Sequence, residues 1–232
     1  MRRLIADKED TEQVFHIIEA LNGDAQRRNL MRFAATKRGQ ALLAEKPSLP
    51  DMLDDHDTLR RLPEGSVGRA YVDFMEREGL TAAGLVADSQ KSYGDRPAYN
   101  DDLEYYGTRL RDTHDLFHVL TGYGRDALGE AALLGFSYSQ NPGRGVIFIA
   151  YMGARQIAKV APRGARIMDV LWEGKRHGRT TSKIVQEDIP ALLAEPLDAA
   201  RRRLGIEKPV LYRRALNIIA GVQGPQTVMQ AA

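Results

Sequence analysis

The chain has 232 residues, enough for one compact domain, and 43% of these residues are apolar. Lys and Arg (33) nearly balance Asp and Glu (31), so the sequence lacks the strong basic charge of a dedicated nucleic-acid-binding protein. It contains no cysteine, which excludes disulfides, thiolate nucleophiles, iron–sulfur clusters and cysteine-ligated zinc. Any metal site must therefore be built from His, Asp or Glu.

The beginning of the sequence and its apolar runs indicate neither a secretory signal nor a membrane-spanning helix. The first residues pass directly from two arginines to acidic and polar residues, without the apolar core of a signal peptide. The longest apolar run, 146–152, is far shorter than the ~20 residues that a spanning helix requires. We therefore expect a cytoplasmic protein that does not cross a bilayer.

Apolar spacing predicts a pair of helices within residues 1–55. The first helix follows a cap at Thr11 and ends at the Asn22-Gly23 pair. The second helix is expected to run from about Ala25 to Glu45. The segment 46–57 contains two prolines and clustered acids, which is typical of a loop that separates this pair from the rest of the chain.

The middle of the chain predicts three further helices. Ser66 is expected to cap a helix that ends at Gly79, and a looser polar segment, 81–100, follows it. Residues 102–122 keep a helical spacing of apolar residues, and another helix is expected to start near Asp126. Two glycines lie between these last two helices, so the second can fold back against the first.

The last third of the chain predicts helices and one ambiguous segment. The run 146–151 is the one segment that is compatible with a buried strand. A helix ending at about Trp172 follows it, then a last clear helix over 190–205 and a C-terminal tail over 206–232. We therefore predict a single all-α domain over residues 1–232, with about seven to nine helices.

One group of side chains is suited to metal binding: His114, Asp115, His118 and Glu130, here called the His/carboxylate cluster. On a helix the two imidazoles lie about 40° apart, so both can reach one cation. Asp115 can ligate, act as a base or orient an imidazole. Glu130 falls about 160° from His114 on a continuous helix, so it can join the site only if the chain turns back between them.

The alternative interpretation of His114 and His118 is a chance arrangement of two histidines on a helix surface, without a metal. We assign no role to the other histidines, His16, His56 and His177. The basic groups at 201–203 and 213–214 are interpreted as solvated helix faces, with lipid headgroups as the alternative partner.

The His/carboxylate cluster matches the signature H-D-x-x-H-x11-E, and at these residues the sequence resembles the coenzyme Q (ubiquinone) biosynthesis protein 4 family. The resemblance extends to the segments LPEGSVGRAYVDFMEREGL, RDTHDLFHVLTGYG, LWEGKRHGR and PLDAARRRLGI. It covers residues 60–205, a family-like core. The N-terminal pair over 1–55 and the C-terminal tail over 206–232 lie outside it.

The resemblance implies an all-helical protein with a divalent metal, usually zinc, held by the His/carboxylate cluster between two helices, and with a groove for lipid. The implied partners are polyprenyl-tailed benzoquinone precursors, other ubiquinone biosynthetic enzymes and the inner face of a membrane, which the protein contacts peripherally. A second copy of the chain is a further candidate partner. Members of the family are interpreted either as organisers of these enzymes or as enzymes themselves.

The leading hypothesis is a metal-dependent oxidative decarboxylation, that is, decarboxylation plus hydroxylation, of a polyprenyl hydroxybenzoate, with the four cluster residues acting through the metal. The apolar run 145–153 can line a groove for the isoprenoid tail. Zinc has no redox chemistry, whereas two His and one carboxylate are also typical of non-haem iron oxygenases, so iron is the alternative metal.

Two other functions remain open. A non-catalytic, lipid-binding scaffold would use the metal only to tie two helices together. A metallohydrolase is the third hypothesis, because H-D-x-x-H resembles H-E-x-x-H with an acid one methylene shorter.

Overall fold

The computed structural model describes residues 21, 23–93 and 101–223, and this part of the chain contains helices and no β-strand. Its only bridge between extended residues joins Ser66 to Pro196. The all-α prediction is therefore confirmed. The helix expected behind Thr11 lies outside the described residues, and none of the described helices has the length and apolarity needed to cross a membrane.

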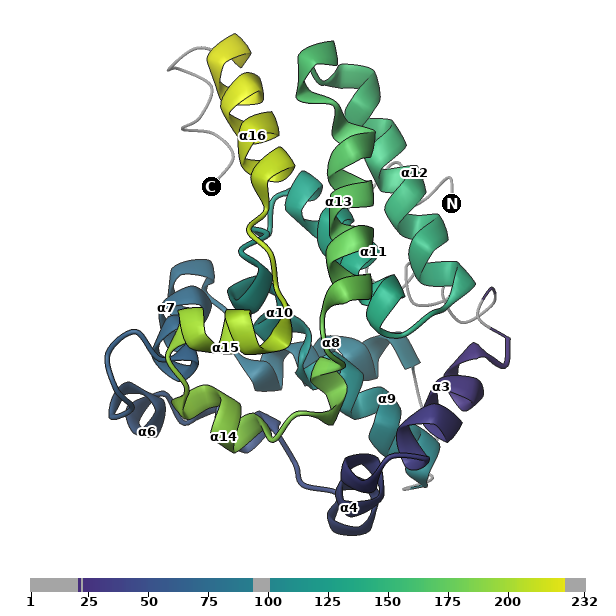
Figure 1. Ribbon diagram of the computed structural model, residues 1–232, viewed down its shortest axis with the longest axis vertical. Coiled ribbons are helices and arrows are strands. Elements are labelled where there is room, and N and C mark those ends of the chain that lie inside the picture. The colour runs from purple at the N-terminus through teal and green to yellow at the C-terminus, as the bar shows by residue number, and fades with distance from the viewer. Residues whose placement is uncertain (1–20, 22, 94–100, 224–232) are drawn as a thin grey trace.

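Four long helices form one half of the molecule, the upper half in Figure 1. The helix α11 packs against two of the others, α12 and α13, while α16 packs along α13. Their bounds are α11 (Ala127–Gln140), α12 (Arg144–Val160), α13 (Ile167–Thr180) and α16 (Val210–Gln223). A 3-10 turn, η1 (Arg163–Ala165), lies between α12 and α13 and packs on α16.

The contact between α11 and α13 depends on glycine. A Cβ atom at Gly174 would lie 2.0 Å from the carbonyl oxygen of Ala132, and one at Gly178 would lie 2.3 Å from that of Phe136. Both distances are far below van der Waals contact, so any other residue would push the two helices apart. This pairing places the start of α11, which carries Glu130, in a fixed position.

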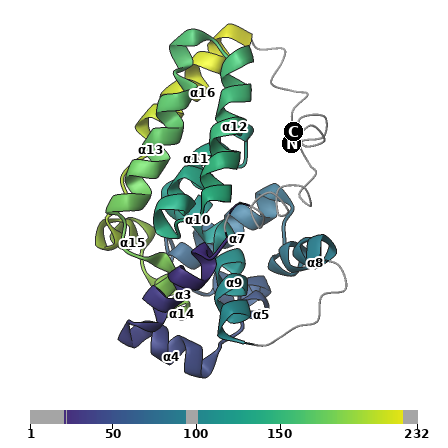
Figure 2. The ribbon, with the colours of Figure 1, turned by 90° about the vertical axis from the view of Figure 1, so that its right-hand side faces the viewer.

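Shorter helices make up the other half and surround α10 (His114–Thr121), as Figures 1 and 2 show. The helix α10 contacts α7, α9 and α15 in this half and α11 in the other. The bounds of these helices are α3 (Ala25–Ala34), α4 (Lys37–Glu45), α5 (Pro50–Asp54), α6 (His56–Arg60), α7 (Val67–Glu78), α8 (Ala82–Tyr93), α9 (Asp102–Asp112), η2 (Ile184–Gln186), α14 (Ile189–Ala194) and α15 (Leu197–Leu204).

One apolar core runs through both halves. Its buried members come from helices of both halves, namely α5, α6, α7, α8, α10, α11, α12, α13, α14, α15 and α16, and α10 lies between the two groups of helices. A second, smaller cluster lies under α3, α4 and α9: Phe33, Leu42, Tyr106 and Val185. The continuity of the main core is the physical basis of the single domain.

The first half of the sequence forms more helices than its apolar spacing predicts. The expected helix 25–45 is divided into α3 and α4, because the Thr36 hydroxyl donates to the carbonyl of Phe33 and accepts the N–H of Gly39. The expected loop 46–57 contains α5 and begins α6. The polar segment after Thr81 forms α8, whose first amides donate to the carboxylate of Asp54.

The second half of the sequence corrects four further expectations. The run 146–151 belongs to α12 and not to a strand, because Gly145, Ile149, Ala150 and Ala154 recur at helical spacing and are buried. The following helix continues beyond Trp172 to Thr180. The expected helix 190–205 is divided into α14 and α15 before Pro196, and the tail 206–232 contains the helix α16.

Candidate metal centre

The two histidines of the His/carboxylate cluster lie on α10, a helix of their own. The single helix expected over 102–122 is divided at Thr113, where the backbone leaves the helical conformation (φ −89°, ψ 0°). The buried hydroxyl of Thr113 donates to the carbonyl of Arg109, a contact that often bends a helix. The spacing of the histidines is unaffected because both lie after this break. The helix ends at Gly122, whose φ of 76° is the left-handed conformation that glycine adopts readily.

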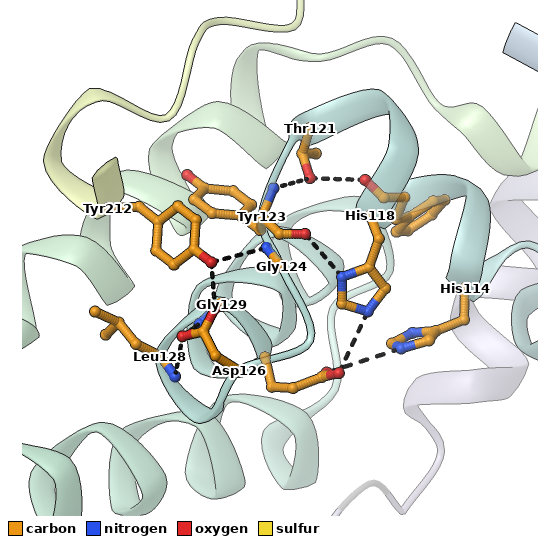
Figure 3. Close-up of polar contacts among 11 residues, drawn as sticks. His114, His118, Thr121, Tyr123, Gly124, Asp126, Leu128, Gly129 and Tyr212 are labelled. Atoms are coloured by element: carbon orange, nitrogen blue, oxygen red, sulfur yellow. Dashed lines mark hydrogen bonds and ion pairs between the residues drawn. The ribbon is translucent and has the colours of Figure 1, made fainter. Parts of the chain in front are cut away.

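The turn after Gly122 brings Glu130 back to the histidines. Glu130 lies in the first turn of α11, which begins behind the cap that Asp126 forms with the amides of Leu128 and Gly129. Its carboxylate oxygens lie 3.9 Å from Nε2 of His114 and 3.4 Å from Nε2 of His118. Figure 3 shows both imidazoles turned toward the same point.

Asp115 completes the group. One ligand atom each from His114, Asp115 and His118 lies within 4.8 Å of the other two. Asp115 is buried, and its charge helps to raise the pKa of Tyr71, which burial alone already raises. The buried hydroxyl of Tyr71 has no hydrogen-bond partner in the described part of the chain. The structure thus brings all four residues of the His/carboxylate cluster to one place.

The tautomer of His118 prepares it for a cation. Its Nδ1 lies 2.9 Å from the carbonyl oxygen of Tyr123, an acceptor only, so Nδ1 carries the proton. Its Nε2 is buried and makes no hydrogen bond to any described residue, although the carboxylate of Glu130 lies beside it. A lone pair facing a carboxylate is satisfied only by a proton or a cation between them. This donor set, imidazole nitrogen with carboxylate oxygen, suits zinc or iron.

The surrounding charges keep Glu130 ionised and His114 neutral. Burial raises the pKa of Glu130, but the two histidines and Arg125 outweigh it and lower that pKa. Burial and the neighbouring His118 lower the pKa of His114. Burial also acts against protonation of His118, but Glu130 outweighs burial and raises its pKa. Neutral imidazole and ionised carboxylate are the forms that bind metal.

The apolar side of the site is closed by Phe74 of α7, whose ring stacks on His118 at 5.4 Å. The side toward solvent carries Arg125, which is exposed and whose charge lowers the pKa of both His114 and Glu130. The other nearby arginine, Arg111, already forms an ion pair with the buried carboxylate of Asp112 at 2.7 Å. Arg125 is therefore an exposed cationic residue whose charge acts on the cluster.

A cavity of about 500 Å³ lies between α5, α8 and α9. It is lined by Leu49, Val86, Tyr105 and Asp112 among others, and by none of the four cluster residues. It is therefore separate from the candidate metal centre.

Arg201 was expected on a solvated helix face, and that expectation is wrong. Its guanidinium donates to the carbonyl oxygens of Val119 at 3.0 Å and Leu120 at 2.9 Å, at the end of α10. A cation at a helix C-terminus is favoured by the helix dipole. Arg201 therefore holds α10 against α15, whereas Arg213 and Arg214 are exposed as expected.

Of the remaining histidines, His16 lies outside the described residues and His56 lies on α6, with its Nδ1 3.6 Å from a carboxylate oxygen of Glu76. His177 is buried on α13, where Nδ1 lies 3.2 Å from the hydroxyl oxygen of Tyr123 and Nε2 lies 3.4 Å from a carboxylate oxygen of Glu207. No local pattern predicts this arrangement, because Tyr123 and His177 lie 54 residues apart.

The stability of the protein is expected to fall on acidification partly because of His177. Burial lowers the pKa of His177 below its ordinary value of 6.5, so the folded protein keeps it neutral while the unfolded chain binds a proton. Stability is therefore lost as the pH falls below the unfolded pKa. Urea unfolding at about pH 7.5 and about pH 5.5 should show a smaller loss in His177→Gln than in the wild type. An equal loss in both proteins would contradict this assignment, and His56→Gln is the control.

The fold and the site define an all-helical protein with a His/carboxylate cluster between two helices. The family model of the coenzyme Q (ubiquinone) biosynthesis protein Coq4 matches residues 4–210. The chain therefore belongs to the Coq4 family. The match begins well before residue 60, so the family resemblance includes most of the N-terminal part, which was expected to lie outside it.

Curated relatives carry the same family name. "Ubiquinone biosynthesis protein COQ4, mitochondrial" of Ajellomyces capsulatus (strain NAm1 / WU24) is 30% identical over 190 residues, which are 78% of this chain and 62% of that protein. The namesake from Pyrenophora tritici-repentis (strain Pt-1C-BFP) is 31% identical over 182 residues, 77% of this chain and 58% of that one. The chain thus spans about three fifths of the length of these relatives.

A crystal structure has a similar fold. The protein, from Nostoc punctiforme PCC 73102, is described as a candidate ubiquinone biosynthesis protein. It superimposes with a TM-score of 0.65 at 22% identity, over 88% of this chain and 93% of that chain. At this identity the likeness supports the fold.

Proposed function

We propose that this protein acts in ubiquinone biosynthesis by the oxidative decarboxylation of a polyprenyl hydroxybenzoate. The observation that carries the proposal is the His/carboxylate cluster, in which the buried Nε2 of His118 faces Glu130 and lacks a hydrogen bond among the described residues. Membership of the Coq4 family supplies the pathway.

The residues that would hold a divalent metal are His114, His118 and Glu130, with Asp115 as a further ligand or as a carboxylate that orients an imidazole. When bound, the metal supplies Lewis-acid stabilisation of the negative charge that develops on the ring as carbon dioxide leaves. Zinc is favoured by the family resemblance. Iron is favoured by the reaction, because hydroxylation of the ring carbon is a two-electron oxidation that requires an oxidant such as dioxygen.

The chain's own residues would bind and shield the substrate. Arg125, exposed beside the cluster, would pair with the carboxylate or phenolate of the ring. Phe74 and the buried face of α10 exclude water from the other side of His118. Exclusion of water strengthens each of these electrostatic contacts.

The isoprenoid tail requires an apolar surface close to a membrane. Phe148 and Tyr151 of α12 are 39% and 38% exposed, and Trp172 of α13 is 41% exposed. At ~0.8 kcal/mol for each buried CH₂, a long tail stays in lipid unless protein surface replaces it. We therefore propose that the protein binds peripherally at the inner face of a membrane through α12 and α13. The names of both curated relatives place those proteins in mitochondria.

The test is release of carbon dioxide from a ring-carboxyl-labelled polyprenyl hydroxybenzoate, with dioxygen present and with zinc-loaded or iron-loaded protein. Glu130→Gln is expected to lower turnover by at least about 100-fold, because it removes a negatively charged ligand. The matched control is Glu76→Gln, which alters an exposed carboxylate on α7 and should keep full turnover.

Stoichiometric metal without turnover in the wild type would contradict the enzymatic proposal and favour the lipid-binding scaffold. In that case metal removal should still lower stability, because the cluster joins α10 to α11. Co-purification with other ubiquinone biosynthetic enzymes would then be the relevant assay.

A further inference from the structure

The loop between α10 and α11 has two functions at the candidate metal centre. The carbonyl of Tyr123 accepts the Nδ1 proton of His118, which leaves Nε2 free for a cation. Asp126, at the other end of the loop, caps the helix on which Glu130 lies. The position of this loop therefore sets both the histidine tautomer and the place of the carboxylate.

Tyr212 of α16 fixes the loop from the outside, as Figure 3 shows. Its hydroxyl accepts the N–H of Gly124 at 3.0 Å and donates to the carboxylate of Asp126. Its ring packs edge to face on the ring of Tyr123, with centroids 5.5 Å apart. The Tyr212 side chain thus contacts the loop at Tyr123, Gly124 and Asp126. Tyr123 holds His118 through its carbonyl, and Asp126 caps the helix that carries Glu130.

The place of Tyr212 is itself set by a buried carboxylate. Glu173 of α13 is 2% exposed and accepts the backbone N–H groups of Leu211 at 2.7 Å and Tyr212 at 3.2 Å. An acid at a helix N-terminus satisfies amides that have no partner within the helix. The start of α16 is therefore tied to the rigid pair of α11 and α13.

We infer that Tyr212 is a positioning residue for the candidate metal centre: its hydroxyl holds the loop that orients His118 and Glu130. The inference rests on the proposed metal-binding function. It also assigns a role to α16, which lies almost wholly beyond the part of the chain that matches the family.

A purely structural role for Tyr212 makes a different prediction. It would lower the stability of the fold and leave the metal affinity and the His118 tautomer unchanged. Tyr212→Phe separates the two, because it removes only the hydroxyl and keeps the ring contact with Tyr123. Tyr106→Phe is the matched control: Tyr106 is equally buried, and its hydroxyl donates to Asn141 at 2.7 Å, away from the cluster.

A second variant approaches the same contact from the loop. A Cβ atom at Gly124 would lie 2.7 Å from the hydroxyl oxygen of Tyr212 and 3.0 Å from a carboxylate oxygen of Asp126. Gly124→Ala must therefore disturb the contact between the loop and the Tyr212 hydroxyl, while the sequence of α16 stays unchanged. If the inference is right, this variant reproduces the effect of Tyr212→Phe.

The first measurement is zinc affinity of the full-length chain by competition with a chromophoric chelator. We expect about tenfold weaker binding in Tyr212→Phe and in Gly124→Ala, and less than about twofold change in Tyr106→Phe. The second is the tautomer of His118 in the metal-free proteins, from the nitrogen chemical shifts of its ring by NMR at a pH at which the ring is neutral. We expect one Nδ1–H tautomer in the wild type and a mixture in the two loop variants.

Wild-type affinity together with a wild-type tautomer in Tyr212→Phe would overturn the inference and leave the proposed function standing. Absence of zinc binding by the wild type would instead overturn the metal part of the proposed function. The tautomer comparison then decides the inference by itself, since it needs no metal. A mixture of tautomers in Tyr106→Phe as well would also overturn it.

Discussion

Replacing His118 with alanine is expected to abolish metal binding and turnover together. His118 is the most deeply buried ligand of the cluster, and its Nε2 has no hydrogen bond within the described part of the protein. Loss of this imidazole leaves one partly exposed histidine, His114, with the carboxylates of Asp115 and Glu130, so the site loses its buried nitrogen donor. Elemental analysis of protein purified without chelator should give near-stoichiometric zinc or iron for the wild type and none for His118→Ala.

The matched control for this experiment is His56→Ala. His56 also lies beside a carboxylate, that of Glu76 at 3.6 Å, but has no second histidine nearby on its short helix. It should keep the metal. A thermal unfolding scan adds a second readout, because metal at about 100 times its Kd stabilises the binding protein by about 2.7 kcal/mol. Retention of metal by His118→Ala, or equal loss in His56→Ala, would contradict the assignment.

The parts of the site that could be predicted from the sequence are those carried by local spacing. The separation of His114 and His118 places both on one helix face, whatever the rest of the fold does. The glycines after Thr121 indicate the turn, and Asp126 is a typical helix cap. From these signals alone it follows that Glu130 can meet the histidines.

The supports of the site could not be predicted, because each depends on a partner far along the chain. Arg201 looks like one of three solvated arginines until its contact with the end of α10, 81 residues earlier, is known. Tyr212 reaches Asp126 across 86 residues. No local pattern encodes such contacts, and the resemblance to the family carried no information beyond residue 205.

The errors in the predicted secondary structure have a different cause, namely competition between the intrinsic conformational preference of a segment and the burial of its side chains. The residues around Ile147 favour strands by intrinsic propensity, but Ala150 and Ala154, which lie about one helical turn apart, are buried on one face of α12, and α12 packs against α11 and α13. The division at Thr113 has a local cause in its hydroxyl group, which donates back to the carbonyl of Arg109. Such a threonine is tolerated in many helices, so its presence does not by itself predict a break.

Replacing Arg109 with methionine is expected to destabilise the fold by about 2–4 kcal/mol, as measured by urea unfolding. Arg109 is 2% exposed, and its guanidinium donates to the carbonyl oxygens of Val185 and Glu187, both at 2.7 Å. It is therefore the link between α9 and the segment around η2.

Methionine keeps most of the volume of Arg109 but leaves both carbonyl groups without their donor. Arg109→Lys should recover little of the loss, because a single ammonium group cannot reproduce two fixed N–H donors. The control is Arg60→Met, which removes exposed ion pairs with Asp73 and Glu76 and should cost less than about 1 kcal/mol. Equal effects of the two methionine substitutions would show that the buried contacts of Arg109 add nothing. A large effect confined to Arg109 would mean that its buried contacts hold α9, which leads directly into α10, against the segment around η2.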